Sequence, residues 1–177
     1  MAAMAPRLRK FALTAHVTSS VGLLGAIAAF LVLAGAGLTS QDTKIVRAAY
    51  LAMELIARLV IVPLAFASLL SGIIQSLGTP WGLFRHYWVL VKLLLTAFAT
   101  SVLLSKMALI SYVSRVAAAT TLSRADLHAA RIELVVHAAG GLLVLLVPAL
   151  LSVYKPPGLT RYGWQKQSNI LLRRSVS

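Results

Sequence analysis

The chain has 177 residues, of which 59% are hydrophobic and 12% charged, and its mean hydropathy is +0.87. Soluble domains carry about 25% charged residues, so this composition excludes a soluble protein, and the length allows one domain. The formal net charge of +13 comes mainly from basic residues in tails and loops. We therefore expect the lipid bilayer and its anionic head groups as partners, and no nucleic acid. The absence of cysteine excludes disulfides and thiolate metal sites.

The first predicted span covers residues 11–38 and contains no Lys, Arg, Asp or Glu. The basic stretch before it is typical of a signal peptide, but the apolar run is too long for one, so we expect this span to be retained. Small residues at Thr18, Gly22 and Ala26 recur every fourth position. This spacing favours close contact with another helix.

The second predicted span covers residues 59–77, with a helical lead-in from about residue 40. Thr39 and Asp42 have capping-box spacing, which predicts the start of this helix. Glu54 and Arg58 are four residues apart and share a helix face. They form either part of a solvated lead-in or a charge pair that faces the bundle interior. Pro63 predicts a kink.

The third and fourth predicted spans cover residues 87–105 and 134–154, and a basic tail, 155–177, follows. Thr79 with Pro80, and Ser123 with Asp126, have the spacing of helix starts. A span needs about 20 apolar residues and must be helical, because lipid cannot bond to the backbone. The predicted fold class is therefore all-α, a single-domain integral membrane four-helix bundle.

The distribution of basic residues predicts the orientation. Four spans place both termini on one side, and that side carries nine basic residues against six on the other. The nine are Arg7, Arg9, Lys10, Arg85, Lys155, Arg161, Lys166, Arg173 and Arg174, and the six are Lys44, Arg47, Lys106, Arg115, Arg124 and Arg131. The positive-inside rule then predicts an N-in/C-in multi-pass protein of the bacterial inner membrane, with a cytoplasmic tail.

A first candidate site combines polar residues of the first and third spans. Lys92 either snorkels to the interface beside Trp88 or faces a site inside the bundle. His16 is either a core histidine bonded to a helix hydroxyl or a ligand for a metal or haem. The two residues lie at similar depth in the inner half, and His86 lies at the same interface. We expect any cofactor to bind at these residues, between the first and third helices near the inner face, with His16 as the metal ligand.

A second candidate polar site contains Glu133 and His137, together with Glu54 and Arg58. Glu133, His137 and Gly141 share one face of the fourth helix. The pair is either ordinary helix chemistry or a carboxylate that orients a metal-binding histidine, with the glycine leaving room for a flat ligand. His16 and His137 enter from opposite ends of the bundle, so we do not expect both to ligate one iron.

The stretches "HVTSSVGLLGAIAAFLVLAG" and "QSLGTPWGLFRHYWVLVKLLLT" resemble an uncharacterised family of small bacterial integral membrane proteins, which has no established activity. More distantly, the plan is similar to copper-resistance D type membrane domains and to the bacterial membrane protoporphyrinogen oxidase, a haem-b protein. His16, Trp88 and Lys92 within "VKLLLT" fall at places comparable with that oxidase. The resemblance implies binding of haem b or a porphyrin in the inner half of the bundle.

Two functions are therefore open from the sequence. The first is a structural or accessory membrane protein, acting as a homo-oligomer or with another membrane protein. The alternative is a haem- or metal-binding redox or transport protein that uses the site between the first and third helices. The sequence contains no nucleotide-binding or hydrolase motif. It therefore gives no direct indication of an enzyme, and the question of enzymatic activity stays open.

Overall fold

Four long helices make up the described part of the chain. The computed structural model describes residues 4–78, 86–119 and 127–154, and positions 158, 160, 164 and 165 of the tail. The helix starts predicted at Thr79–Pro80 and at Ser123–Asp126, and most of the 155–177 tail, lie outside these residues. The elements are α1 (Pro6–Thr39), α2 (Thr43–Ile56), η1 (Ala57–Ile61), α3 (Val62–Gly78), α4 (Tyr87–Ala118) and α5 (His128–Tyr154).

The second of the four helices consists of α2, η1 and α3, which run without interruption from Thr43 to Gly78. All four helices are long and apolar enough to cross a membrane. Each contains one of the four predicted spans. The predicted all-α bundle is therefore confirmed, and the chain is a multi-pass membrane protein.

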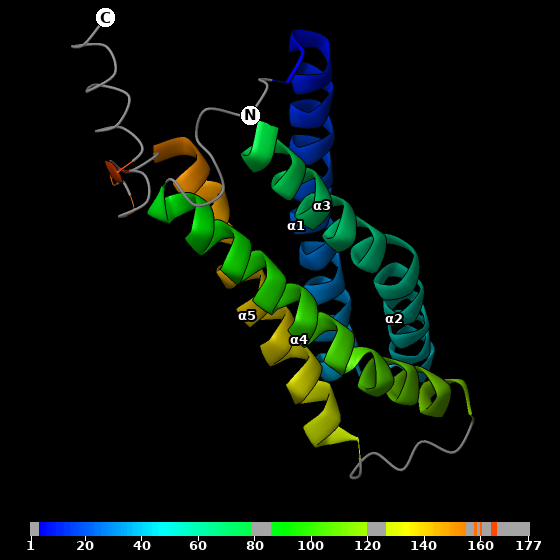
Figure 1. Cartoon of the computed structure of the whole chain (residues 1–177). Coiled ribbons are helices and arrows are strands. Elements are labelled where there is room, and N and C mark those ends of the chain that lie inside the picture. The colour runs from blue at the N-terminus through cyan, green and yellow to red at the C-terminus, as the bar shows by residue number, and fades with distance from the viewer. Residues whose placement is uncertain are drawn as a thin grey trace, which may run out of the picture.

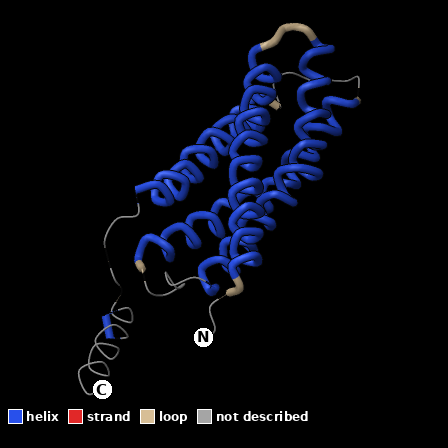
Figure 2. The backbone as a smooth tube through the Cα atoms, turned by 90° about the horizontal axis from the view of Figure 1, so that it is seen from above, coloured by secondary structure: helices blue, strands red, loops and turns tan. Residues whose placement is uncertain are grey.

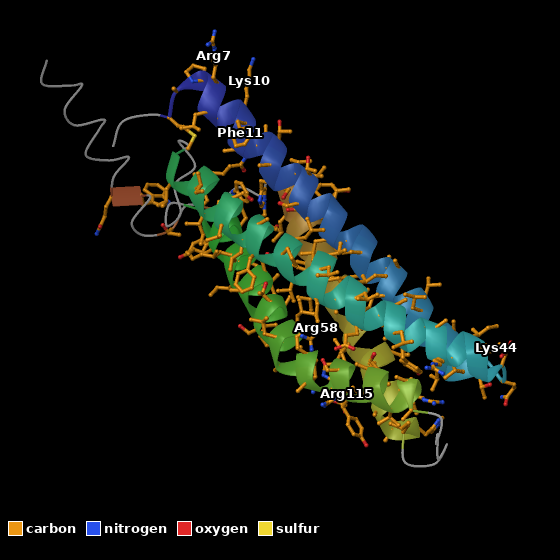
Figure 3. The ribbon with its side chains drawn as sticks, turned by 90° about the vertical axis from the view of Figure 1, so that its right-hand side faces the viewer. Arg7, Lys10, Phe11, Lys44, Arg58 and Arg115 are labelled. Atoms are coloured by element: carbon orange, nitrogen blue, oxygen red, sulfur yellow. The ribbon has the colours of Figure 1, made fainter. Side chains whose placement is uncertain are left out.

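The helices alternate in direction along the bundle (Figure 1). α1 begins and α5 ends at one end, here called the terminal end. α1 ends, α2 begins, α4 ends and α5 begins at the opposite end, here called the loop end. Figure 3 places Arg7 and Lys10 at the terminal end and Lys44 at the loop end.

The helices run lengthwise beside one another (Figure 2), and their contacts close into a ring. α1 packs against the second helix and against α5, and α4 packs against the same two neighbours. α1 and α4 therefore lie across the bundle from each other. A site between the first and third helices would have to form across the bundle interior.

The most deeply buried part of the core lies toward the loop end. Tyr50 and Met53 are each 1% exposed, and Val113 and Leu127 pack in the same cluster. Gly37 lets the Tyr50 ring approach α1, because a Cβ there would lie 2.6 Å from Tyr50 Cζ.

The second helix contains one wide π-helical turn, η1, just before Pro63. The Val62 N–H bonds to the Ala57 carbonyl, five residues back. A proline has no N–H and clashes with the carbonyl four residues earlier, here that of Leu59. The irregularity predicted at Pro63 therefore takes the form of a π turn.

The start of the second helix differs from the sequence prediction. Thr39 is the last residue of α1, and its Oγ1 donates a hydrogen bond of 2.9 Å to the Gly35 carbonyl. Asp42 is the N-cap of α2, and its carboxylate accepts from the Lys44 N–H at 2.8 Å. The capping-box interpretation was wrong, because the Thr39 hydroxyl is bonded within the preceding helix.

Candidate functional site

His16 faces α3. Its Nδ1 lies 3.1 Å from the Ser68 carbonyl and 3.2 Å from Ser71 Oγ. Because a carbonyl only accepts, Nδ1 carries the proton of the neutral imidazole and donates it to Ser68. A Cβ on Gly72 would lie 3.1 Å from His16 Cε1, so this glycine allows the ring to pack closely on α3.

The small residues after His16 are also engaged with α3 or with their own helix. Ser20 and Ser68 share a hydrogen bond of 2.8 Å between their hydroxyls. Ser19 donates to the His16 carbonyl at 3.1 Å. A Cβ on Gly22 would lie 3.3 Å from a Leu64 methyl group. The space beside Ser20 and Gly22 is therefore filled by α3.

Lys92 connects α4 to α5. Its Nζ donates a 2.6 Å hydrogen bond to Ser152 Oγ, and Ser152 donates in turn to the Pro148 carbonyl at 2.8 Å. The ammonium also lies 5.6 Å from the centre of the Trp88 ring, within the range of a cation–π contact. Lys92 thus has a partner on a neighbouring helix as well as the expected contact with Trp88.

His86 and Trp88 lie at the terminal end of α4. His86 is the N-cap residue of that helix, and its ring centre lies 6.2 Å from that of Trp88, at an interplanar angle of 52°. His16 and Lys92 both lie in the terminal half of the bundle. However, the first hydrogen-bonds α3 and the second α5, so these contacts direct them toward different neighbours.

Glu54 and Arg58 form a charge pair next to α4. Glu54 Oε1 accepts from Arg58 Nε at 3.1 Å, and Arg58 Nη2 donates to Ser111 Oγ at 2.7 Å. Figure 3 shows Arg58 where the second helix passes α4. Arg58 lies in η1, so the wide turn helps to set the direction of its side chain toward Ser111.

Glu133 and His137 lie close to Lys106, which is not one of the residues of the predicted sites. Lys106 Nζ on α4 lies 2.6 Å from Glu133 Oε1 on α5. His137 Nδ1 lies 2.8 Å from the Glu133 backbone carbonyl, which fixes the proton on Nδ1 and leaves Nε2 as an acceptor. The Glu133 carboxylate therefore pairs with the lysine, and its backbone orients the histidine.

Lys106, Thr100 and His137 are the polar residues in the wall of a cavity of about 340 Å³, here called the interhelical cavity. All four helices contribute to its apolar lining. Gly140 and Gly141 border it, and a Cβ at either position would meet nothing within 4 Å. Among the described residues, the inner-half candidates His16, Lys92, His86 and Trp88 are not part of this lining.

The pairing of Lys106 with Glu133 could have been predicted from the sequence. The predicted third span ends at residue 105, and Lys106 was counted only among the basic residues of the side opposite the termini. Glu133 comes near the start of the following antiparallel helix, so opposite charges on consecutive helices predict a pair. Within the described ranges, no three His, Asp or Glu side chains gather into a metal-binding group.

No family model matches the chain, and neither a curated protein nor a solved structure matches it. A function must therefore be inferred from the contacts described above.

Proposed function

We propose that the protein is a structural or accessory component of the bacterial inner membrane, with both termini in the cytoplasm. Polar bonds between neighbouring helices carry this proposal. They connect α1 to α3, the second helix to α4, and α4 to α5, through His16–Ser68, Arg58–Ser111, Lys92–Ser152 and Lys106–Glu133. Lipid offers no hydrophobic drive between helices, so such bonds and close packing hold a membrane bundle together.

A rigid bundle with apolar outer faces is suited to association within the bilayer. Large apolar side chains are exposed on every helix, for example Val32, Phe66, Leu94 and Val153. A second copy of the chain or another membrane protein could pack on these faces. The basic residues at the terminal end, including Arg7 and Lys10, would contact anionic head groups of the cytoplasmic leaflet.

Serine substitutions test the structural role. Interhelical hydrogen bonds in membrane proteins are worth about 0.6 kcal/mol on average, so Ser111→Ala and Ser152→Ala should each lower thermal stability slightly. Ser101→Ala is the matched control, because Ser101 bonds only the Ala97 carbonyl of its own helix at 2.9 Å. Melting is followed by circular dichroism in mild detergent. Equal melting of all three variants and the wild type would contradict the proposal.

Haem or metal binding at His16 is the second candidate function. Its support is the hydrogen bond from Nδ1 to the Ser68 carbonyl, because ligating histidines are commonly oriented in this way and bind through Nε2. The contacts of Ser20 and Gly22 with α3 do not fit a porphyrin ring beside them unless α1 and α3 separate. The His16 imidazole is therefore suited to bind a metal ion, whereas the space beside it does not suit haem.

An absorption spectrum tests the haem form of the second function. A structural protein purified in mild detergent, after growth with haem precursor, should show no Soret band. A Soret band that His16→Ala removes while helical content is kept would establish haem at the predicted site. A band that survives His16→Ala but disappears in His137→Ala would place the haem toward the loop end.

A further inference from the structure

We propose that the interhelical cavity binds one single-chain, membrane-soluble alcohol. The apolar chain would lie among the four helices, and the hydroxyl would lie between Lys106 and His137. The volume of about 340 Å³ is at the lower end of the ~300–1,000 Å³ range of small-molecule sites, which favours one chain over two. This inference goes beyond the structural role and does not depend on it.

The polar side chains of Lys106 and His137 lie in the part of the cavity nearer the loop end. The rest of the lining is apolar except for Thr100, whose hydroxyl donates to the Thr96 carbonyl of its own helix at 2.8 Å. On α4, Lys106 lies eight residues closer to the loop end than Phe98, and on α5 His137 lies eight residues closer to it than Leu145. Eight helical residues rise about 12 Å, so both helices place the polar groups at the same end of the cavity. A ligand that matches this arrangement has a polar head and an apolar chain parallel to the helices.

The polar end has no net charge to offer a ligand. Lys106 is paired with Glu133 at 2.6 Å. A charged head group would therefore have to compete with an existing ion pair, and breaking a partly buried pair leaves one charge without its partner, which is costly. A neutral head group has no such cost.

The polar end offers both a donor and an acceptor. His137 Nδ1 is bonded to the Glu133 carbonyl, so Nε2 accepts. The Lys106 ammonium has three protons, and its bond to Glu133 uses one of them. A hydroxyl group is a small neutral group that can donate to one of these partners and accept from the other.

The glycines of α5 create the space for the chain. The sequence "AAGG" occupies residues 138–141, and no heavy atom of a neighbouring element lies within 4 Å of a Cβ built on Gly140 or Gly141. Gly22, Gly37 and Gly72 each contact a facing side chain, whereas Gly25 and Gly35 also have open space beside them but do not line the cavity. The pair at 140 and 141 therefore borders open volume, as a ligand site requires.

The test uses a photoreactive long-chain alcohol and the full chain in lipid nanodiscs. Cross-links are mapped by mass spectrometry, with dodecanol, dodecane and dodecanoate as competitors. We expect labelling of the α4 and α5 segments that line the cavity. Dodecanol should compete about tenfold better than dodecane, as expected for one or two well-formed hydrogen bonds. Dodecanoate should compete no better than dodecane.

Two variants and their matched controls locate the site. Gly141→Phe should fill the cavity and reduce labelling about tenfold, a loss equivalent to one decade in affinity. Gly25→Phe is the control, because Gly25 also has nothing within 4 Å of its Cβ but does not line the cavity. His137→Phe should remove the preference for dodecanol over dodecane, whereas Lys92→Met should keep it.

Equal competition by dodecanol and dodecane in the wild type would overturn the proposal, because it would show that the hydroxyl is not recognised. So would equal labelling of Gly141→Phe and Gly25→Phe, which would place the probe on the outer lipid-facing surface. If Gly141→Phe does not fold, the competition series in the wild type decides. Neither result depends on the melting experiments that test the structural role.

Discussion

Arg131 and Tyr50 form the most unusual contact at the loop end. The Arg131 guanidinium carbon lies 5.4 Å from the centre of the Tyr50 ring, and the two residues are 8% and 1% exposed. Tyr50 Oη and Arg131 Nε have no hydrogen-bond partner among the described residues. A cation–π contact of about 2 kcal/mol, the size found when the charge is desolvated, offsets part of that cost. The ring position therefore matters for stability.

Gly37→Ala should destabilise the protein. The added methyl group would lie 2.6 Å from Cζ of the buried Tyr50 ring, and overpacking of this kind costs about 1–3 kcal/mol. Gly35→Ala is the control, since its Cβ meets nothing within 4 Å and alanine favours a helix by up to about 1 kcal/mol. Thermal melting in detergent should rank Gly35→Ala at or above the wild type and Gly37→Ala below it. The reverse order would show that the ring moves away without cost.

Lys106→Met should be less stable than the double variant Lys106→Met with Glu133→Gln. The single change leaves the Glu133 carboxylate, whose side chain is 40% exposed, without its cation beside an apolar bundle, whereas the double change removes both charges. Lys44→Met is the control, because Lys44 is an exposed residue at the start of α2. Melting temperatures measured at one detergent concentration compare the variants. If the single and double variants melt together, the pair has no structural role.

At the scale of elements, the π turn η1 lies just before Pro63 and contains Arg58, which contacts Ser111. The π turn contains one residue more than an α-helical turn, so it rotates the part of the helix before it by about 100° relative to a continuous α-helix. Arg58 and Glu54 lie in and before this turn. The proline at position 63 therefore influences which side chains of the second helix face Ser111.

Pro63→Ala should weaken the contact between Arg58 and Ser111. Alanine restores the N–H and lets the turn return to α-helical geometry, which would rotate Arg58 away from α4. A double-mutant cycle with Arg58→Leu and Ser111→Ala measures the coupling, which we expect at about 0.6–1.7 kcal/mol in the wild type. In the Pro63→Ala background it should approach zero. In Pro148→Ala, a proline change within α5, it should be unchanged, and a loss there would point to general loosening of the bundle.

The type and number of secondary-structure elements could be predicted from the sequence, because few kinds of backbone structure can cross a lipid bilayer. Apolar runs of about 20 residues or more determined the helix number and fold class. The ends were harder to place. α4 continues from the predicted limit at residue 105 to Ala118, because Lys106 has a partner on α5 and does not have to leave the bundle.

The candidate sites could be predicted only at the level of single residues. The Glu54–Arg58 pair is four residues apart on one helix, and it is present in the structure. His16 was correctly singled out as a polar group within a helix, but its partners are 52 and 55 residues away in sequence. Which helix lies next to α1 depends on the ring order of the bundle, and no local pattern in the chain specifies that order.

At the scale of the whole molecule, the polar end of the interhelical cavity lies toward the loop end. The basic residues counted for each side predict that the loop end faces away from the cytoplasm. The proposed alcohol would then have its hydroxyl in the outer half of the bilayer. Orientation in the membrane therefore decides from which leaflet such a ligand enters.

Reporter fusions at both termini should report a cytoplasmic location. Nine basic residues against six favour this orientation, and the positive-inside rule operates through such differences. A green fluorescent reporter at either terminus should be bright, and a periplasmic phosphatase reporter at either terminus should be inactive. A phosphatase inserted between residues 120 and 126 should be active. Active phosphatase at the C-terminus would invert the assignment or require an odd number of spans.

The ring order also has a consequence for biogenesis. Helices leave the ribosome in chain order, so α5 is the last to enter the bilayer. It carries Ser152 and Glu133, the partners of Lys92 and Lys106, and it closes the ring against α1. A nascent chain that stops before residue 128 has neither of these partners for its α4 lysines. Exposure of these two lysines to lipid would distinguish an unfinished chain from a complete one for the cell's membrane proteases.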